Sequence, residues 1–351
     1  MHPVKSSPHH PGRIRLGLCC QFSQAPIKFR TTTATALARL PRRDQLVRLA
    51  ELCRHNADSL LAALEFCAAH GIGAFRIQSQ ILPVKTHPQA GYRIEELSEA
   101  KDIVMRFRRC GAFAKEKNIR TGFHPDHFVV LNSPDRGVVG RAVADLEYQA
   151  EVAEWTNADT INIHGGGAYG DKRAALKTLR RNLNRLSSRS RSRLTLENDD
   201  KSFTPADLLP VCRAEGIPLV YDAHHHRCCP DGLSVEAASA AAADTWGKRE
   251  PLFHISSPVE GWRGPRPGRH HDYIDPKDFP AGWLKLRLTV EVEAKAKELA
   301  VRKLREALSA KARFVPRINA RLFSGFVLSA AWPWAWSGGW RRVFWPHRPV
   351  R

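Results

Sequence analysis

Histidines and carboxylates recur at the ends of short apolar segments of this sequence, and these residue types are common protein ligands of divalent metals. Six imidazoles and three carboxylates stand at the segment ends or in the loops that follow. They are His87, His124, His164, Glu197, Asp222, His225, His254, His270 and Glu293. Mixed imidazole and carboxylate donors suit Mn²⁺, Zn²⁺ or Fe²⁺, so the set indicates metal chemistry.

The size of this set separates it from ordinary core residues. A single histidine in a strand is usually a core residue with satisfied hydrogen bonds. Several buried carboxylates are different, because each is costly to bury unpaired and a bound cation offsets that cost. Nine candidates exceed the needs of one ion, so we expect two or three ions. Clusters of this kind cleave phosphodiesters by activating water and stabilising the leaving oxygen.

Eight β-type segments carry these residues, and helical patterns alternate with them. The predicted strands are residues 15–19, 74–78, 120–124, 160–164, 193–198, 218–222, 251–256 and 288–293. The predicted helices are residues 48–70, 96–117, 138–156, 173–186 and 205–215. This alternation predicts an α/β fold, a TIM (β/α)8 barrel, whose active site lies where the strands end. An open doubly wound sheet is the alternative, although no GxGxxG follows the first strand.

The chain is strongly basic. Its 351 residues include 55 Lys and Arg against 35 Asp and Glu, a formal net charge of +20. Such a surface favours a polyanionic partner, because each neutralised phosphate releases counterions, although a merely solvated basic surface is the plainer interpretation. With several metals, the charge favours phosphate-ester hydrolysis on nucleic acid. The main rival, a metal-dependent TIM-barrel sugar isomerase, uses similar ligands but does not need this charge.

The ends of the chain differ from its centre in composition. Residues 1–13 are expected to be a disordered leader, residues 14–305 the barrel, and residues 306–351 a basic, Trp-rich and poorly ordered extension. The apolar passage at 322–345 is interrupted by Pro333, Arg341 and Arg342, so stable membrane insertion is not expected, whereas an interfacial helix stays open. Eight cysteines without zinc-ribbon spacing, and no signal peptide, favour reduced thiols and a cytoplasmic location with DNA.

A series of short motifs resembles the UV damage endonuclease family and covers about residues 13–305. The motifs are RLGLCC at 15–20, FRI at 75–77, THP at 86–88, HPDHFV at 124–129, IHGGGAYGDK at 163–172, LEND at 196–199, DAHHH at 222–226, HISS at 254–257, HHDYI at 270–274 and EAKAKE at 293–298. The resemblance implies a monomeric TIM barrel that nicks double-stranded DNA 5′ to cyclobutane pyrimidine dimers and 6-4 photoproducts and so starts excision repair.

The resemblance also implies the metal ligands. All nine residues named above match ligand positions of the family, which usually holds about three Mn²⁺ ions; Zn²⁺, Mg²⁺ and Fe²⁺ stay open. The catalytic carboxylates are then Glu197, Asp222 and Glu293. In the run His224–His226 the alignment favours His225 as the ligand, and His271 competes with His270.

Other matched positions concern DNA. His127 and Phe128 stand where the family inserts a probing pair, usually Gln and an aromatic residue, into the lesion gap, although Phe128 could instead be a core residue. Lys172 is a candidate phosphate contact or a solvated lysine. Leu252 replaces a lysine that some members carboxylate, and Leu18 replaces a common aromatic residue.

Two further functions remain open beside the UV damage endonuclease and the sugar isomerase. An apurinic-site endonuclease of the related barrel type would use the same kinds of metal ligand at the strand ends but would lack the probing pair. A catalytically dead DNA-binding barrel is disfavoured because every ligand position is filled.

Overall fold

The computed structural model describes residues 14–314, with side chains described to residue 310. Its strands are short, apolar and mostly buried, as expected for parallel strands covered by helices. They are β1 (Ile14–Cys19), β2 (Ala74–Ile77), β3 (Arg120–Phe123), β4 (Thr160–His164), β5 (Leu194–Glu197), β6 (Leu219–Asp222), β7 (Leu252–Ile255) and β8 (Leu288–Val292). Each lies within a few residues of a predicted strand, so the predicted order of strands is confirmed.

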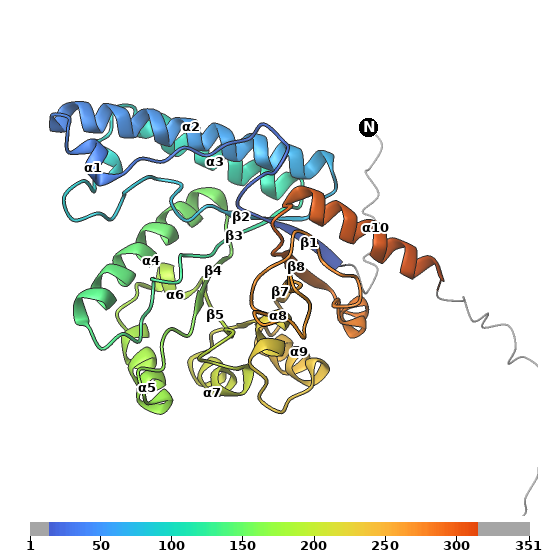
Figure 1. Ribbon diagram of the computed structural model, residues 1–351. Coiled ribbons are helices and arrows are strands. Elements are labelled where there is room, and N and C mark those ends of the chain that lie inside the picture. Colours follow the sequence, from blue (N-terminus) through green and yellow to red (C-terminus); the bar gives the residue numbers. More distant parts are fainter. Residues whose placement is uncertain (1–13, 315–351) are drawn as a thin grey trace, which may run out of the picture. The chain divides into compact units, whose positions relative to one another are not determined.

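The strands close into a barrel in the order of the chain. Closure occurs because β1 pairs in parallel with both β2 and β8; Gly17 is in register with Ala74 on one side and with Glu291 on the other. This confirms the predicted TIM barrel and excludes the open doubly wound sheet. All strands point the same way, so their carboxyl ends meet at one rim of the barrel. Figure 1 shows the strands at the centre and the helices outside them.

The helices lie between successive strands. They are α1 (Ala34–Leu37), α2 (Arg42–Ala69), α3 (Ala100–Glu116), α4 (Arg136–Thr156), α5 (Lys172–Leu183), α6 (Ser188–Arg191), α7 (Pro205–Glu215), α8 (Ala223–Cys228), α9 (Val235–Asp244) and α10 (Glu298–Phe314), with 3₁₀ turns at Ile94–Glu96 and Ala281–Lys285. Prediction was sharpest for α7, whose ends carry local signals. The Thr204 hydroxyl accepts the amide N–H of Asp207, and Gly216 ends the helix with a φ of 64°.

Helix α10 crosses the boundary that the sequence analysis placed between residues 305 and 306. It continues because apolar residues recur at helical spacing, and Leu304 and Leu308 both join the hydrophobic core. The predicted leader at 1–13 and the Trp-rich passage at 322–345 lie outside the described residues.

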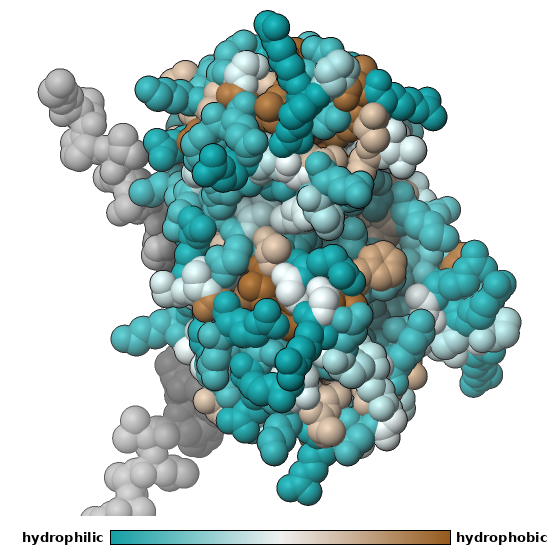
Figure 2. Space-filling view, turned by 90° about the vertical axis from the view of Figure 1, so that its left-hand side faces the viewer, coloured by the Kyte–Doolittle hydropathy of each residue, from teal (hydrophilic) through white to brown (hydrophobic). Residues whose placement is uncertain are grey.

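The described part of the chain contains no helix with the length and hydropathy needed to span a membrane. Figure 2 shows one face of the molecule, on which hydrophilic residues predominate and apolar side chains form small, separate groups.

Candidate metal centre

Glu197 is the hub of a polar cluster at the carboxyl rim of the barrel. It is the last residue of β5 and is 0% exposed. Its carboxylate oxygens lie 3.0 Å from Nε2 of His124 and 3.0 Å from Nδ1 of His254. The Asn162 amide on β4 also donates to this carboxylate. Residues from three other strands or strand ends therefore converge on this one buried carboxylate.

Six of the nine predicted ligands form three overlapping groups whose ligand atoms lie within 4.8 Å of one another. The groups are His124, His164 and Glu197; His124, His254 and Glu293; and Glu197, Asp222 and His254. Each triad combines imidazole and carboxylate donors at a spacing that a single divalent ion can bridge. The convergence expected from the strand ends is thus present, and the shared members join the three groups into one basin.

Unsatisfied atoms in this basin test whether the residues fit a metal. Oδ2 of Asp222 and Nδ1 of His164 are both buried and have no hydrogen-bond partner in the described structure. Burying such atoms without a partner is costly. The other carboxylate oxygen of Asp222 is satisfied, because it accepts the amide N–H of His225 and caps α8. A bound cation would give both atoms a partner, so the donor set fits a metal.

The histidine run at 224–226 lies on α8, and its three members have different surroundings. Nδ1 of His225 lies 3.4 Å from Glu197 and 3.6 Å from Asp222, which joins His225 to the basin. His226 instead bonds to Tyr221 and Asp231, at 2.8 Å each, and has a structural role. His224 is buried against Trp262. Proximity to Glu197 and Asp222 favours His225 as the ligand of the run, although both ring nitrogens of His224 are buried without a hydrogen-bond partner.

The two loop histidines differ from each other. Nδ1 of His270 lies 3.8 Å from Oε2 of Glu293, whereas Nδ1 of His271 accepts the amide N–H of Tyr273. His270 is thus the better placed of the two. His87 lies in none of the three groups; its Nδ1 accepts amide N–H bonds in its own loop, and it lines a cavity together with His164 and His225. Its ligand role stays a prediction.

Sequence reasoning missed two charged residues in this barrel interior, Arg76 of β2 and Glu291 of β8. Arg76 is 8% exposed, and its guanidinium donates to both Glu291 and Glu293; Nη2 lies 2.7 Å from Oε1 of Glu293. A signal for Glu291 was available, because residues two apart on a strand share a face, and Glu293 was already placed in the site. Arg76 stands in the FRI motif at 75–77, but its pairing with Glu291 follows only from the register of β2 against β1 and β8.

The charges of the cluster hold its carboxylates ionised. Burial by itself raises the pKa of Glu197, but His254, His164 and His124 outweigh it and hold that pKa well below its usual range. Burial also raises the pKa of Glu293, but Arg76 outweighs it, and that pKa is likewise well below its usual range. Burial lowers the pKa of His164. Burial also lowers the pKa of His254, but Glu197 outweighs it and raises that pKa to about 10. The ionised carboxylates are therefore in the form that binds metals, whereas His254 must lose a proton to coordinate an ion.

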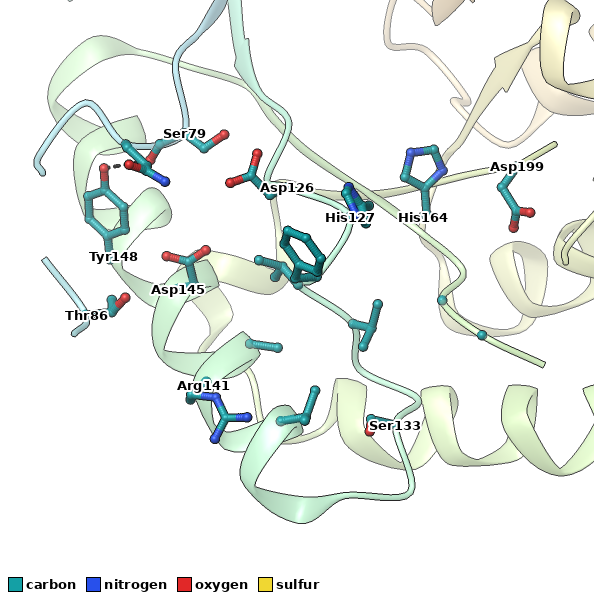
Figure 3. Close-up of a pocket in the computed structure, with 18 of the residues that line it drawn as sticks. Ser79, Thr86, Asp126, His127, Ser133, Arg141, Asp145, Tyr148, His164 and Asp199 are labelled. Atoms are coloured by element: carbon teal, nitrogen blue, oxygen red, sulfur yellow. Dashed lines mark hydrogen bonds between the residues drawn. The ribbon is translucent and has the colours of Figure 1, made fainter. Parts of the chain in front are cut away.

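A cavity of about 1060 Å³ opens beside the cluster. Figure 3 shows its wall, with His164 and Asp199 at one end and Asp126, Asp145 and Tyr148 at the other. His127 and Phe128 line it, and Phe128 is 73% exposed, which excludes the alternative that this ring is a core residue. Lys172 begins α5, and its Nζ lies 2.8 Å from Asp207, so in this structure its ammonium is paired with a carboxylate.

Leu252, the position at which some family members carry a carboxylated lysine, has an apolar environment. It forms a small buried cluster with Val220 and Trp246. Position 252 therefore supplies no carboxylate to this barrel.

Asp145 of α4 is a second unusual carboxylate on the cavity wall. Burial and the nearby Asp126 raise its pKa to about 6. An aspartate in an unfolded chain has a pKa near 3.9, so the unfolded chain loses this proton at a lower pH than the folded chain does. The free energy of unfolding therefore falls as pH rises from about 4 to 6. We predict that Asp145→Asn increases the free energy of unfolding by about 2 kcal/mol at pH 8 and by less than half as much near pH 4.5.

Urea unfolding at the two pH values measures this difference. Asp272→Asn, at an exposed loop carboxylate, is the control and is expected to give no comparable gain. An equal gain from Asp145→Asn at both pH values would contradict the assignment.

Known proteins resemble the chain over most of its length. The family described as UV-endonuclease UvdE matches residues 14–320. A protein named UV DNA damage endonuclease from Bacillus velezensis (strain FZB42) is 33% identical over 307 residues, which cover 83% of this chain and 91% of that protein. Its namesake from Bacillus cereus (strain B4264) is 32% identical, over 84% of this chain and 93% of that protein.

Solved structures agree with these sequence relatives. The crystal structure of SacUVDE has a TM-score of 0.76 and 27% identity, and the similarity covers 86% of this chain and 99% of that one. Endonuclease IV from Thermus thermophilus has a TM-score of 0.53 at 20% identity, covering 72% of this chain and 94% of that one, and shares the fold.

Proposed function

The chain belongs to the UV-endonuclease UvdE family, and from this premise we propose that it is a metal-dependent DNA endonuclease acting beside UV photoproducts. The nick falls 5′ to cyclobutane pyrimidine dimers and 6-4 photoproducts in double-stranded DNA and starts their excision repair. Mn²⁺ is the proposed cofactor, as two or three ions, with Zn²⁺, Mg²⁺ and Fe²⁺ as the metals to compare with it.

One observation carries the proposed metal dependence: the convergence of imidazoles and carboxylates on Glu197, with buried ligand atoms left unsatisfied. The same interior holds four carboxylates, from Glu197, Asp222, Glu291 and Glu293, and Arg76 offsets only part of their charge. Residual negative charge in a buried basin favours divalent cations.

The proposed chemistry is attack of water on the phosphate beside the lesion. Bound divalent ions would activate that water and stabilise the leaving oxygen. Glu197, Asp222 and Glu293 are the carboxylates proposed to hold the ions, together with the six imidazoles of the predicted set. Nδ1 of His124 lies 3.1 Å from the carbonyl oxygen of Pro125, and donation to that oxygen directs Nε2 toward Glu197. Such outer hydrogen bonds fix the orientation of a ligand.

The cavity beside the basin is proposed to receive the damaged bases. Phe128 and Tyr169, the latter 54% exposed, are the two exposed aromatic residues that line it. Tyr169 has a φ of 48°, and a Cβ at Gly167 would lie 2.9 Å from its ring, so Gly167 leaves room for the ring to pack. Lys85, Arg141 and Lys201 line the same wall and are the candidate phosphate contacts, although four aspartates also line the cavity.

Phe128→Ala is predicted to weaken binding of a UV-irradiated duplex. Stacking of an aromatic side chain on a base contributes roughly 1–3 kcal/mol, which corresponds to a loss of about 5- to 150-fold in affinity. Fluorescence anisotropy with irradiated and undamaged duplexes measures the loss, and Phe128→Trp is expected to retain affinity. The control is Met105→Ala on α3, a side chain 61% exposed that does not line the cavity. Equal losses on both duplexes would count against a role in lesion recognition.

Incubation of the purified chain and Mn²⁺ with three duplexes tests the proposed function as a whole. One duplex is UV-irradiated, one contains an abasic site and one is undamaged. We expect a nick 5′ to the photoproduct, mapped on a sequencing gel. Nicking of the abasic duplex alone would replace the proposal with an apurinic-site endonuclease.

A further inference from the structure

The loop between β4 and α5 holds an aromatic ring at the wall of the cavity. Tyr169 lies in this loop, and its side chain is 54% exposed. Phe128 lines the same cavity but comes from the loop between β3 and α4, so the two exposed aromatic residues reach the cavity from separate segments. Within residues 14–310, no hydrogen bond or contact with another aromatic ring restrains the side chain of Tyr169.

The backbone at Tyr169 is unusual for a residue with a bulky side chain. The carbonyl oxygen of Ala168 accepts the amide N–H of Asp171 at 2.9 Å, which closes a tight turn. The two central residues of this turn, Tyr169 and Gly170, have φ values of 48° and 85°. Two positive φ values in succession are the pattern of a type I′ turn, which favours Gly, Asn or Asp at both positions. Tyr169 therefore occupies a strained position.

The surrounding loop is fixed, although about half of the ring is exposed. The ring packs against Gly167, where a Cβ would lie 2.9 Å from it. Asn132, which is 2% exposed, holds this segment, because its Nδ2 donates to the carbonyl oxygen of Gly167 at 2.8 Å. Its Oδ1 leaves no room for a side chain at Gly166, where a Cβ would lie 2.0 Å away. Strained residues that a fixed surrounding holds in place cluster at ligand-binding sites.

We propose that Tyr169 is a specificity residue of the cavity: its ring stacks on a base that has left the DNA helix, and it forms a second stacking surface beside Phe128. This inference rests on the proposed function. Bases of an intact duplex stack on their neighbours, so only a displaced base offers its face to the ring. A photoproduct links two adjacent bases, each with one outer face, and the cavity has two exposed aromatic side chains to cover them.

The test measures binding of the full-length chain to three duplexes by fluorescence anisotropy. One duplex is UV-irradiated, one carries a single-base bulge without a photoproduct, and one is fully paired. Tyr169→Ala is expected to weaken binding of the first two by about 5- to 150-fold and to leave the third within about twofold. Tyr169→Phe keeps the ring and should bind as the wild type does. Gly167→Ala should cause a smaller loss, because its Cβ displaces the ring without removing it.

Tyr169→Asn separates a role in binding from a role in the turn. Asparagine tolerates left-handed backbone, so the turn should persist while the ring is lost. Relief of strain and loss of packing on Gly167 oppose each other, so the unfolding midpoint should stay within about 2 °C of the wild type. Binding of the irradiated duplex should still fall as in Tyr169→Ala. Met105→Ala, at an exposed apolar residue outside the cavity, is the matched control and should leave binding of all three duplexes unchanged.

The bulged duplex separates this inference from the proposed function. If Tyr169→Ala and Tyr169→Asn bind the irradiated and bulged duplexes as tightly as the wild type does, the inference is overturned even if the wild type nicks irradiated DNA. Equal losses on all three duplexes, or a fall in the midpoint of Tyr169→Asn far beyond about 2 °C, would assign the ring a structural role and also overturn it. Conversely, a selective loss on the bulged duplex supports the inference even if the wild type nicks no irradiated duplex, a result that would overturn the proposed function alone.

Discussion

Glu197→Gln is expected to abolish nicking of a UV-irradiated duplex while the duplex stays bound. The substitution keeps the size of the side chain but removes the charge on which His124, His225 and His254 converge. An amide is a poor partner for divalent ions at this hub, so the ions that activate water would be lost or misplaced. The proposed lesion binding involves Phe128 and the cations of the cavity wall, which this change does not touch.

The expected loss is about a thousandfold in rate, since a bound ion contributes several kcal/mol of transition-state stabilisation and about 4 kcal/mol corresponds to three orders of magnitude. Single-turnover nicking gives the rate, and anisotropy on the same irradiated duplex gives the affinity. Affinity is expected to change less than about fivefold, which is within about 1 kcal/mol.

Glu250→Gln is the matched control for this variant. It removes a carboxylate that is paired with Arg15 and Arg287, but Glu250 precedes β7 and so lies at the amino end of the barrel, away from the rim. It should lower the unfolding temperature and leave the nicking rate within about twofold, well under 1 kcal/mol of activation free energy. Undiminished nicking by Glu197→Gln would remove the hub from the proposed chemistry.

The residues whose convergence could be predicted from the sequence are those whose position depends only on strand ends. Glu197, Asp222 and His254 each lie in the last residues of a parallel strand, and in a closed parallel barrel these ends must meet. No knowledge of side-chain contacts was needed for that inference. The same set included the loop residue His270, which follows the seventh predicted strand and which the structure brings to within 3.8 Å of Glu293.

The residues that were missed depend on contacts across the barrel. Arg76 and Glu291 are 215 positions apart in the chain, and their pairing follows from the joint register of β2, β1 and β8. Asp145 is similar, since its raised pKa depends on Asp126 and on the way α4 packs against the cavity. A hydrophobicity pattern predicts the face of the strand on which a residue lies. Predicting which residues pair across the barrel also requires the register of each strand against its neighbours.

Removal of divalent metal by a chelator is expected to stop nicking and to lower the unfolding temperature, with both restored by Mn²⁺. The stability effect follows from the orphaned Oδ2 of Asp222 and Nδ1 of His164, and from four carboxylates of which only Glu291 and Glu293 pair with Arg76. An ion that binds only the folded chain stabilises it by about 2.7 kcal/mol at a hundred times its Kd. For a chain of this size, that shifts the midpoint by on the order of 4 °C.

Differential scanning calorimetry and the nicking assay, run on the same chelated and reloaded samples, measure the two effects together. Repeating the reloading with Zn²⁺, Mg²⁺ and Fe²⁺ ranks the metals, which the mixed donor set leaves open. Asp222→Asn is the informative variant, because it keeps the cap of α8 through its side-chain oxygen but weakens the orphaned ligand. It should lose much of the stabilisation by Mn²⁺. If the chelated wild-type chain kept its unfolding midpoint and its nicking rate, the imidazoles and carboxylates at the rim would hold no ion that contributes to stability or to nicking.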